Sequence, residues 1–239
     1  MQKIKKHHFM IDKGVLEKIC RYANLKKSET ILEIGAGTGN LTEFLTDRCG
    51  FVYAIEKDRN FYNTLKEKFS YLENIEIINA DVLRIDLPKF DKVVSNLPYG
   101  ISRRITERLL RERFQLGILV YQREFVQKLL AKPGTRDYRY ISALMQSCAD
   151  VEILDGIPPE AFDPKPMVFS AIVRVKPRIV AEQHYIDFLH SLFNQRNKKI
   201  ENLIKLRGEL PENLQKRRAF ELKPEELREI YSNLYFNLS

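Results

Sequence analysis

The chain has 239 residues, of which 44% are hydrophobic and 30% charged, and its net charge is +8. No stretch approaches the ~18 apolar residues of a membrane span, and the N-terminal MQKIKKHHF lacks the apolar core of a signal peptide, so we expect a cytoplasmic protein without a membrane partner. The positive charge favours a polyanionic partner such as nucleic acid, although the charged surface of a thermophile's protein is also basic in some cases without binding anything.

The first predicted element is a helix that Asp12 caps and whose apolar face comprises Val15, Leu16, Ile19 and Cys20. Short apolar strands then alternate with amphipathic helices, which is typical of a doubly wound parallel sheet. The predicted strands are residues 29–34, 51–56, 75–80, 92–96 and 115–121. The predicted helices are residues 40–48, 58–71 and 102–113, and two that begin near residues 124 and 140.

The pattern changes near residue 150. Residues 151–157 and 169–177 are predicted as two strands joined by a proline-rich segment without a helix, hence an antiparallel pair at the sheet edge. After residue 177 the strand pattern stops, and helices are predicted at residues 184–194, 198–207, 212–219 and 225–234. We therefore predict a Rossmann-like α/β domain with a mixed, mostly parallel sheet over residues 1–177 and a small helical C-terminal domain over residues 178–239.

The three cysteines, Cys20, Cys49 and Cys148, lie far apart in the sequence and form no C-x-x-C pair. Free buried thiols in a reducing compartment are the expected state. No histidine stands at metal-ligand spacing from another or from a cysteine, so no metal site is predicted.

The first strand runs into the glycine-rich segment EIGAGTGN, residues 33–40. Its spacing is G-x-G-x-G, and Asn40 stands where the dinucleotide fingerprint has its third glycine, so a cofactor without a pyrophosphate is favoured. Glu56 ends the next strand and can accept hydrogen bonds from both hydroxyls of a ribose, while Asp81 follows the third strand and can accept from an adenine amine. Each acid alone is equally consistent with a helix cap. Together with the glycine loop they indicate S-adenosylmethionine (SAM).

The fourth strand ends in Asn96-Leu97-Pro98-Tyr99. An exocyclic adenine amine is a poor nucleophile because its lone pair is delocalised into the ring. The Asn96 side-chain oxygen and the Leu97 carbonyl can accept its two hydrogens and direct the lone pair at a methyl donor. Pro98 fixes the backbone, and Tyr99 offers a face on which a flipped-out base can stack. The alternative is a polar loop with a turn proline, but its place behind the glycine loop favours catalysis.

Six segments, in this order along the chain, resemble the rRNA adenine N6-dimethyltransferases of the KsgA type: EIGAGTGNLT, AIEKD, ADVL, NLPYGIS, AKPGTRDY and FDPKPMVFSAIVRVKP. The resemblance runs from about residue 9 to residue 177 and continues weakly in LFNQRNKKIENLI. It implies SAM-dependent transfer of two methyl groups to N6 of each of two adjacent adenosines near the 3′ end of small-subunit rRNA during ribosome biogenesis. We expect a monomer whose partner is this rRNA or the immature small subunit.

The motifs and the resemblance together assign the site residues. The predicted catalytic residues are Asn96, Leu97, Pro98, Tyr99 and Phe162. Phe162 would be a second stacking aromatic, and its alternative is an apolar plug under the sheet edge. The predicted cofactor residues are His8, Met10, Glu33, Gly35, Gly37, Glu56, Lys57, Asp81, Val82 and Asn96. The predicted RNA contacts are Arg103, Arg104, Lys132, Arg136 and Arg139, with Lys5 and Lys6 among the residues that add positive charge.

The chain departs from the family pattern in two places. Near the N-terminus the family usually has Gly-Gln-Asn/His-Phe-Leu, whereas this chain has KHHFM at residues 6–10 and therefore lacks the glutamine that covers SAM. After Tyr138 the family often has Gly-Arg-Leu-Ser, whereas this chain has RYIS at residues 139–142, and we expect this difference to affect how the loop meets RNA.

Four alternative functions are each disfavoured by a specific feature of the sequence. A large-subunit rRNA adenine methyltransferase of the macrolide-resistance type shares the catalytic core, but the AKPGTRDY segment favours the small subunit. A non-catalytic assembly or transcription factor on the same fold has no need of an intact Asn96 loop. The basic charge disfavours a protein-glutamine methyltransferase, and the missing third glycine disfavours a nicotinamide dehydrogenase.

Overall fold

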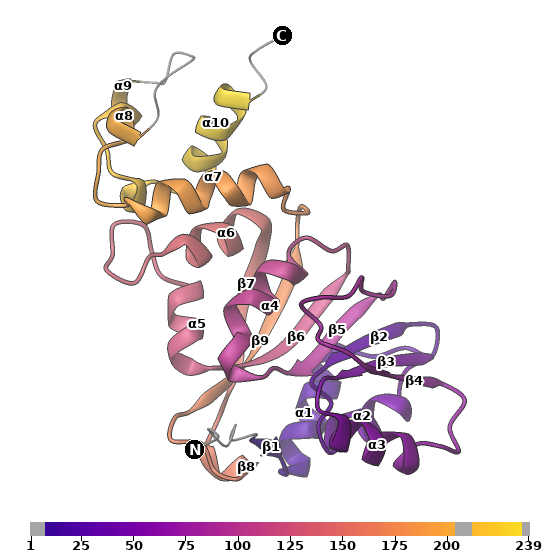
Figure 1. Ribbon diagram of the computed structural model, residues 1–239. Coiled ribbons are helices and arrows are strands. Elements are labelled where there is room, and N and C mark those ends of the chain that lie inside the picture. The colour runs from indigo at the N-terminus through magenta and orange to yellow at the C-terminus, as the bar shows by residue number, and fades with distance from the viewer. Residues whose placement is uncertain (1–7, 204–211, 236–239) are drawn as a thin grey trace. The chain divides into compact units, whose positions relative to one another are not determined.

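Figure 1 shows a computed structural model of the chain, in which residues 8–203 and 212–235 are described. The chain forms two compact units. The first comprises residues up to 105 with residues 114–123 and 152–176, and the second comprises residues 106–113, residues 124–151 and the chain from residue 177. Both units are therefore assembled from separate stretches of sequence. The division into domains of residues 1–177 and 178–239 stays a prediction.

The first unit is built on a seven-stranded sheet with the order β4-β3-β2-β5-β6-β9-β7. Its five neighbouring parallel strands are β4 (Ile75–Asn79), β3 (Phe51–Glu56), β2 (Thr30–Ile34), β5 (Lys92–Asn96) and β6 (Leu116–Gln122). Strand β9 (Ser170–Pro177) pairs antiparallel with β6, and β7 (Ala149–Ile157) lies beyond it at the edge. The predicted mixed, mostly parallel sheet is confirmed.

The strand order reverses between β2 and β5. The chain moves outward from β2 to β4 and then returns to place β5 on the other side of β2. In an open α/β sheet, ligands bind beyond the carboxyl ends of the strands at such a switch point. The glycine loop follows β2 and the Asn96 loop follows β5, so the topology places both loops at this point.

Helices α1 (Lys13–Ala23), α2 (Asn40–Thr46) and α3 (Arg59–Lys68) belong to the same unit. The Asp12 carboxylate accepts a hydrogen bond from the backbone N–H of Val15 at 3.1 Å, which confirms the predicted cap of α1. Helices α2 and α3 both end before the predicted residue. Phe69 leaves the helical conformation after α3, and its buried ring packs near Gly39.

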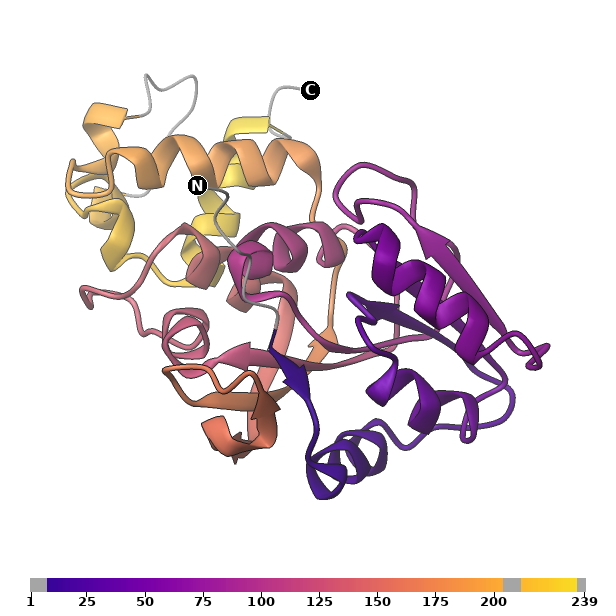
Figure 2. The same cartoon turned by 60° about the horizontal axis from the view of Figure 1, so that its bottom comes forward.

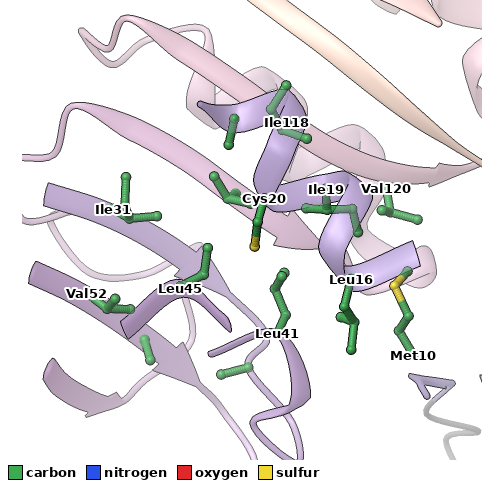
Figure 3. Packing of buried hydrophobic residues seen from close by; sticks show 14 of the residues in the cluster. Met10, Leu16, Ile19, Cys20, Ile31, Leu41, Leu45, Val52, Ile118 and Val120 are labelled. Atoms are coloured by element: carbon green, nitrogen blue, oxygen red, sulfur yellow. The ribbon is translucent and has the colours of Figure 1, made fainter. Parts of the chain in front are cut away.

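The apolar face of α1 packs with α2 and the sheet, as Figure 3 shows. The labelled core residues of the two helices are Leu16, Ile19, Cys20, Leu41 and Leu45, and those of the strands are Ile31, Val52, Ile118 and Val120. All three cysteines are free and buried, as predicted. Burying a side chain of this size contributes about 1.5–3 kcal/mol, so this layer of contacts holds the helices on the sheet.

A short pairing that the sequence did not predict joins the start of the chain to a distant segment. Strand β1 (Phe9–Met10), indigo in Figure 2, leads into α1 and pairs antiparallel with β8 (Phe162–Asp163). Phe9 lies opposite Asp163, and Met10 opposite Phe162. Two-residue strands carry no hydrophobic period, which is why pattern reading missed them.

Helix α4 (Ser102–Leu109) begins in the first unit and continues into the second. The other helices of the second unit are α5 (Arg123–Leu129), α6 (Tyr140–Cys148), α7 (Gln183–Asn194), α8 (Ile200–Leu203), α9 (Glu212–Gln215) and α10 (Pro224–Tyr235). Helices α6, α7 and α10 pack on one another, and the Arg228 guanidinium lies 4.2 Å from the centre of the Tyr185 ring. The predicted C-terminal helices are present, although α8 and α9 are short and residues 204–211 lie outside the described residues.

Candidate active site

The loop after β2 owes its shape to glycines with left-handed backbone angles, among them Gly35 with φ of 74° and Gly37 with φ of 56°. A Cβ at Gly35 would lie 2.9 Å from the Pro98 ring, and a Cβ at Gly37 would lie 2.8 Å from the Phe9 ring. The absence of these side chains lets the Asn96 loop and strand β1 approach the end of β2. Both glycines therefore bring other segments of the site together as well as leaving room for a ligand.

Glu56 at the end of β3 is tied to the glycine loop. Its side chain is buried, and its two carboxylate oxygens accept hydrogen bonds from the backbone N–H of Gly37 at 2.9 Å and of Asp58 at 2.7 Å. The acid therefore lies beside the glycines, where a cofactor ribose would need an acceptor. The structure brings these predicted cofactor residues together.

Asp81 follows β4 and is held in its ionised form. Its Oδ2 lies 2.8 Å from Nζ of Lys57, and its Oδ1 accepts from the backbone N–H of Leu83 at 3.1 Å. The hydrogen bond from Lys57 lowers the pKa of Asp81. The neighbouring Val82 is buried. Because an ionised carboxylate accepts hydrogen bonds and does not donate them, Asp81 suits the amine of an adenine ring.

Glu33, another predicted cofactor residue, is buried at the end of β2, and its role toward the cofactor stays a prediction. Its side chain is 2% exposed, and its Oε2 accepts a hydrogen bond from the Thr42 hydroxyl at 2.6 Å. Burial raises the pKa of Glu33 to about 8. Burial therefore favours the neutral form of this carboxyl group, and its hydrogen-bond partner, Thr42, lies on helix α2.

Asn96 presents a side-chain oxygen that has no hydrogen-bond partner. Its Nδ2 donates to the backbone carbonyl of His8 at 3.3 Å, and because a carbonyl only accepts, this contact fixes which end of the amide faces His8. The Oδ1 atom at the other end is buried and lacks a partner among the described residues. A buried acceptor without a donor is costly, and an amine N–H would satisfy it.

The remainder of the Asn96 loop is anchored on the sheet. The Leu97 side chain is buried, and its N–H donates to the Val120 carbonyl at 3.3 Å. Pro98 has φ of −60°, and a short helical turn, η1 (Tyr99–Ile101), follows it. The Ser102 hydroxyl donates to the Tyr99 carbonyl at 3.1 Å. These contacts hold the loop before any substrate arrives.

Tyr99 stands at the centre of a group of aromatic rings. Its hydroxyl lies 2.7 Å from that of Ser170, and burial raises its pKa, so it stays neutral. The His8 ring is stacked against it at 5.7 Å between ring centres, with 27° between the planes. The buried Phe162 meets Tyr99 edge-on at 6.5 Å and 71°. As it stands, Phe162 supports the Tyr99 ring, and its predicted stacking on a base remains untested.

The predicted RNA contacts fall into two groups. Arg103 and Arg104 are exposed at the start of α4, in the first unit. Three further exposed residues, Lys132, Arg136 and Arg139, lie between α5 and α6 in the second unit. In this loop the Gly134 N–H donates to the Phe220 carbonyl at 2.7 Å, which fastens the loop to the C-terminal part of the chain. Lys5 and Lys6 lie outside the described residues.

Two residues of the site gave no usable signal in the sequence. Ser170, whose hydroxyl pairs with that of Tyr99, is the first residue of a buried strand, a position where a small residue is common and indicates no function. Asn40, which in the sequence marks only the absence of a third glycine, donates from its side chain to the Met10 carbonyl at 2.7 Å. Both contacts join segments that are distant in sequence, so periodicity and spacing do not reveal them.

The described part of the chain contains no group of three or more His, Cys, Asp or Glu side chains placed to hold a metal ion. Within the same residues, no helix is both long and apolar enough to cross a membrane.

Comparison with known proteins identifies similar sequences and folds. The sequence model of the family described as "Ribosomal RNA adenine dimethylase" matches residues 2–228. A protein of Methanococcoides burtonii named "Probable ribosomal RNA small subunit methyltransferase A" is 43% identical, over 97% of this chain and 92% of that protein. A dimethyladenosine transferase structure from Plasmodium falciparum matches with a TM-score of 0.82 at 24% identity, over 95% of this chain and 98% of that one. The structure of the 23S rRNA methyltransferase ErmE matches with a TM-score of 0.71 at 25% identity, over 95% and 99%.

Proposed function

The chain belongs to the ribosomal RNA adenine dimethylase family, and from this premise we propose that it dimethylates N6 of two adjacent adenosines near the 3′ end of small-subunit rRNA. As a member of this family it is an rRNA methyltransferase that uses SAM as the methyl donor and acts in ribosome biogenesis. The choice of the small subunit is supported by the relative that is 43% identical over most of both chains and carries that name. By comparison, the 23S rRNA methyltransferase ErmE is less similar to this chain, at 25% identity.

The assignment of Asn96 as the residue that aligns the target amine rests on one observation. Asn96 holds a buried Oδ1 atom without a partner, while its Nδ2 is already engaged by His8. A target amine placed there would donate one hydrogen to Oδ1 and the other to the Leu97 carbonyl. Both acceptors lie on a loop that is fixed in advance, so the amine nitrogen would be aligned without reorganisation of the protein.

The residues at the ends of β2, β3 and β4 fit the methyl donor. SAM supplies an electrophilic methyl group on a positively charged sulfur. Gly35 and Gly37 would allow its close approach, Glu56 would accept from its ribose hydroxyls, and Asp81 would accept from its adenine amine. The bent glycine backbone and the two acids at adjacent strand ends support this placement.

The target adenine would stack on Tyr99, whose hydroxyl is fixed by Ser170. After the transfer the nitrogen must lose a proton. A protonated amine attached to a purine is strongly acidic, so no strong general base is needed, and Tyr99 stays neutral because burial raises its pKa. Asn96, Leu97 and Tyr99 therefore act by alignment rather than by proton abstraction.

The proposal also covers the residues that contact RNA, the domain organisation, the oligomeric state and the location of the enzyme. The exposed positions of Arg103, Arg104, Lys132, Arg136 and Arg139 suit contacts with phosphates. We further propose that the helical segment from residue 178 is a separate domain, that the enzyme acts as a monomer, and that it meets the immature small subunit in the cytoplasm.

The decisive experiment is methylation of ribosomal subunits that lack the modification. The purified protein with SAM is expected to convert two adjacent adenosines of small-subunit rRNA to dimethyladenosine, as read by nuclease digestion and mass spectrometry. Large-subunit rRNA in the same reaction is the control. Product found solely in the large-subunit rRNA would replace this proposal with the macrolide-resistance activity.

A further inference from the structure

His8 was predicted to bind the cofactor, yet its contacts are with the residues assigned to the target base. Its carbonyl accepts from Asn96, and its ring is stacked on Tyr99 with 27° between the planes. Its Nδ1 lies 2.6 Å from the Pro164 carbonyl, so Nδ1 must carry a proton and donate it. All three neighbours lie within the first compact unit.

The position of His8 is fixed from two sides. The next residue, Phe9, belongs to β1 and pairs with Asp163 of β8, while the bond to Pro164 holds the imidazole itself. An aromatic pair with ring centres 5.7 Å apart is within the range of favourable stacking. The ring is therefore held against Tyr99 by its hydrogen bond and by stacking together.

The His8 ring lies close to the acceptor atom that a target amine would need. A base whose amine reaches Asn96 Oδ1 must lie on the side of Tyr99 that faces Asn96. His8 lies next to Asn96, because its backbone carbonyl accepts from Nδ2 at the other end of the Asn96 amide. A parallel ring on Tyr99 and a stacked adenine would then compete for one surface.

We propose that the His8 ring occupies the base-stacking surface of Tyr99 in the enzyme without RNA and is displaced when the target adenine enters. The inference rests on the proposed function, since it takes an adenine as the base that stacks there. His8 is thus a positioning residue: it keeps Tyr99 covered and ordered until the correct base replaces it. The conformation that accepts a base is then a fraction of the total, and the apparent affinity for the base is reduced by that fraction.

Base entry is measured with an RNA hairpin that carries the fluorescent base 2-aminopurine at the target position; because this base lacks the 6-amino group that would reach Asn96, it reports stacking on Tyr99 and is not methylated there. His8→Ala and His8→Asn remove the ring while keeping the backbone carbonyl that Asn96 needs. Each is expected to strengthen base entry roughly two- to tenfold, the range of one aromatic stacking interaction. The matched control is His8→Phe, which keeps a ring for stacking on Tyr99 without the bond to Pro164, and its base entry is expected to lie closer to the wild type than that of the two ringless variants. SAM affinity from calorimetry should change less than about twofold in all three variants.

Three results would overturn the proposal. Unchanged base entry in the two ringless variants would mean that the ring does not compete, and weaker entry would mean that it holds the base. A loss of SAM affinity with unaltered base entry would return His8 to the cofactor site. Using two ringless variants guards against one of them failing to fold. Methylation of immature small subunits by the wild type is measured in the same preparation, so failure of the proposed function is seen separately.

Discussion

The side-chain amide of Asn96 donates to the backbone carbonyl of His8 at 3.3 Å, and this single contact determines which atom of Asn96 faces the site. The oxygen is left buried and without a partner among the described residues. A hydrogen-bond acceptor is therefore in place before the target amine arrives. Glu56 and Asp81, the proposed partners of the cofactor's ribose and adenine, are different residues, so their effect on binding and the effect of Asn96 on turnover can be tested separately.

Asn96→Ala is expected to lower turnover at least about 100-fold, the typical loss when one preorganised hydrogen-bonding group is removed. SAM affinity should stay nearly unchanged, because Glu56, Asp81 and the glycine loop are untouched. A methyl-transfer assay beside calorimetry of SAM binding checks the separation. Asn63→Ala, at an exposed position of α3, is the control. Turnover within a few-fold of the wild type would refute the role of Asn96.

Glu56→Gln is expected to weaken SAM binding by about 1.5–3 kcal/mol, the contribution of hydrogen bonds to a charged group. Both oxygens of Glu56 accept from backbone N–H groups, so a glutamine must turn its NH₂ group toward Gly37 or Asp58. Calorimetry measures the change. Glu67→Gln, on the exposed side of α3, is the control and should bind SAM normally. Equal affinities in the two variants would contradict the assignment.

Gly35→Ala should impair both SAM binding and turnover, because its Cβ would lie 2.9 Å from the Pro98 ring at a position with φ of 74°. Gly134→Ala is the control that separates the cost of backbone strain from the cost of a steric clash. Its φ is 85°, but a Cβ there has no neighbour within 4 Å. The left-handed backbone alone costs about 1–2 kcal/mol, which urea unfolding would measure in both variants. Only Gly35→Ala should also lose activity, and a matching loss in Gly134→Ala would count against the contact with Pro98.

Glu33 predicts a pH dependence of stability. Its pKa is about 8 in the folded chain and near 4.5 as a free side chain, so the folded state binds the extra proton between these values. The contribution of Glu33 to the free energy of unfolding is therefore fully present below about pH 4.5. It falls as pH rises toward 8, by at most about 1.4 kcal/mol per pH unit. Glu33→Gln, which is neutral at every pH, should remove this part of the slope. Urea unfolding of both proteins at pH 5.5, 7 and 8.5 tests it, and parallel pH profiles would refute it.

Affinity for RNA should fall with salt, with a slope of log K against log salt of about −0.7 for each single-strand phosphate contact. Reversing the charge of Arg103 and Arg104 together should flatten that slope by about 1.4 if each contacts one phosphate. Binding of an rRNA hairpin at several salt concentrations gives the value. Reversal at the exposed Arg59 and Lys66 of α3 changes the net charge equally and is the control. If the salt slope flattens equally in both variants, the effect is one of net charge and not of direct phosphate contacts.

The sequence by itself determined the sheet and the family, and it predicted the chemical groups of the site. Strand and helix periods predicted β2 to β6 and the helices between them, because buried strands and amphipathic helices differ in the spacing of their apolar residues. Glu56, Asp81 and Asn96 are predicted as site residues because parallel strands end at one edge of the sheet, where their last residues lie near one another. Helix ends were less accurate: the helix predicted to reach residue 113 ends at Leu109, since terminal residues are held by local contacts that no period reports.

Only the tertiary structure decided how these groups are oriented. The contact between Asn96 and His8 joins residues 88 positions apart, and that between Tyr99 and Ser170 joins residues 71 positions apart. Both depend on segments without a repeating pattern, β1 and the stretch from β8 to β9. The same segments bring His8 to Tyr99 and turn Phe162 edge-on to it. Sequence patterns report which face of an element is buried, whereas the partner of each polar atom depends on how distant segments pack, and that packing leaves the oxygen of Asn96 buried without a partner among the described residues.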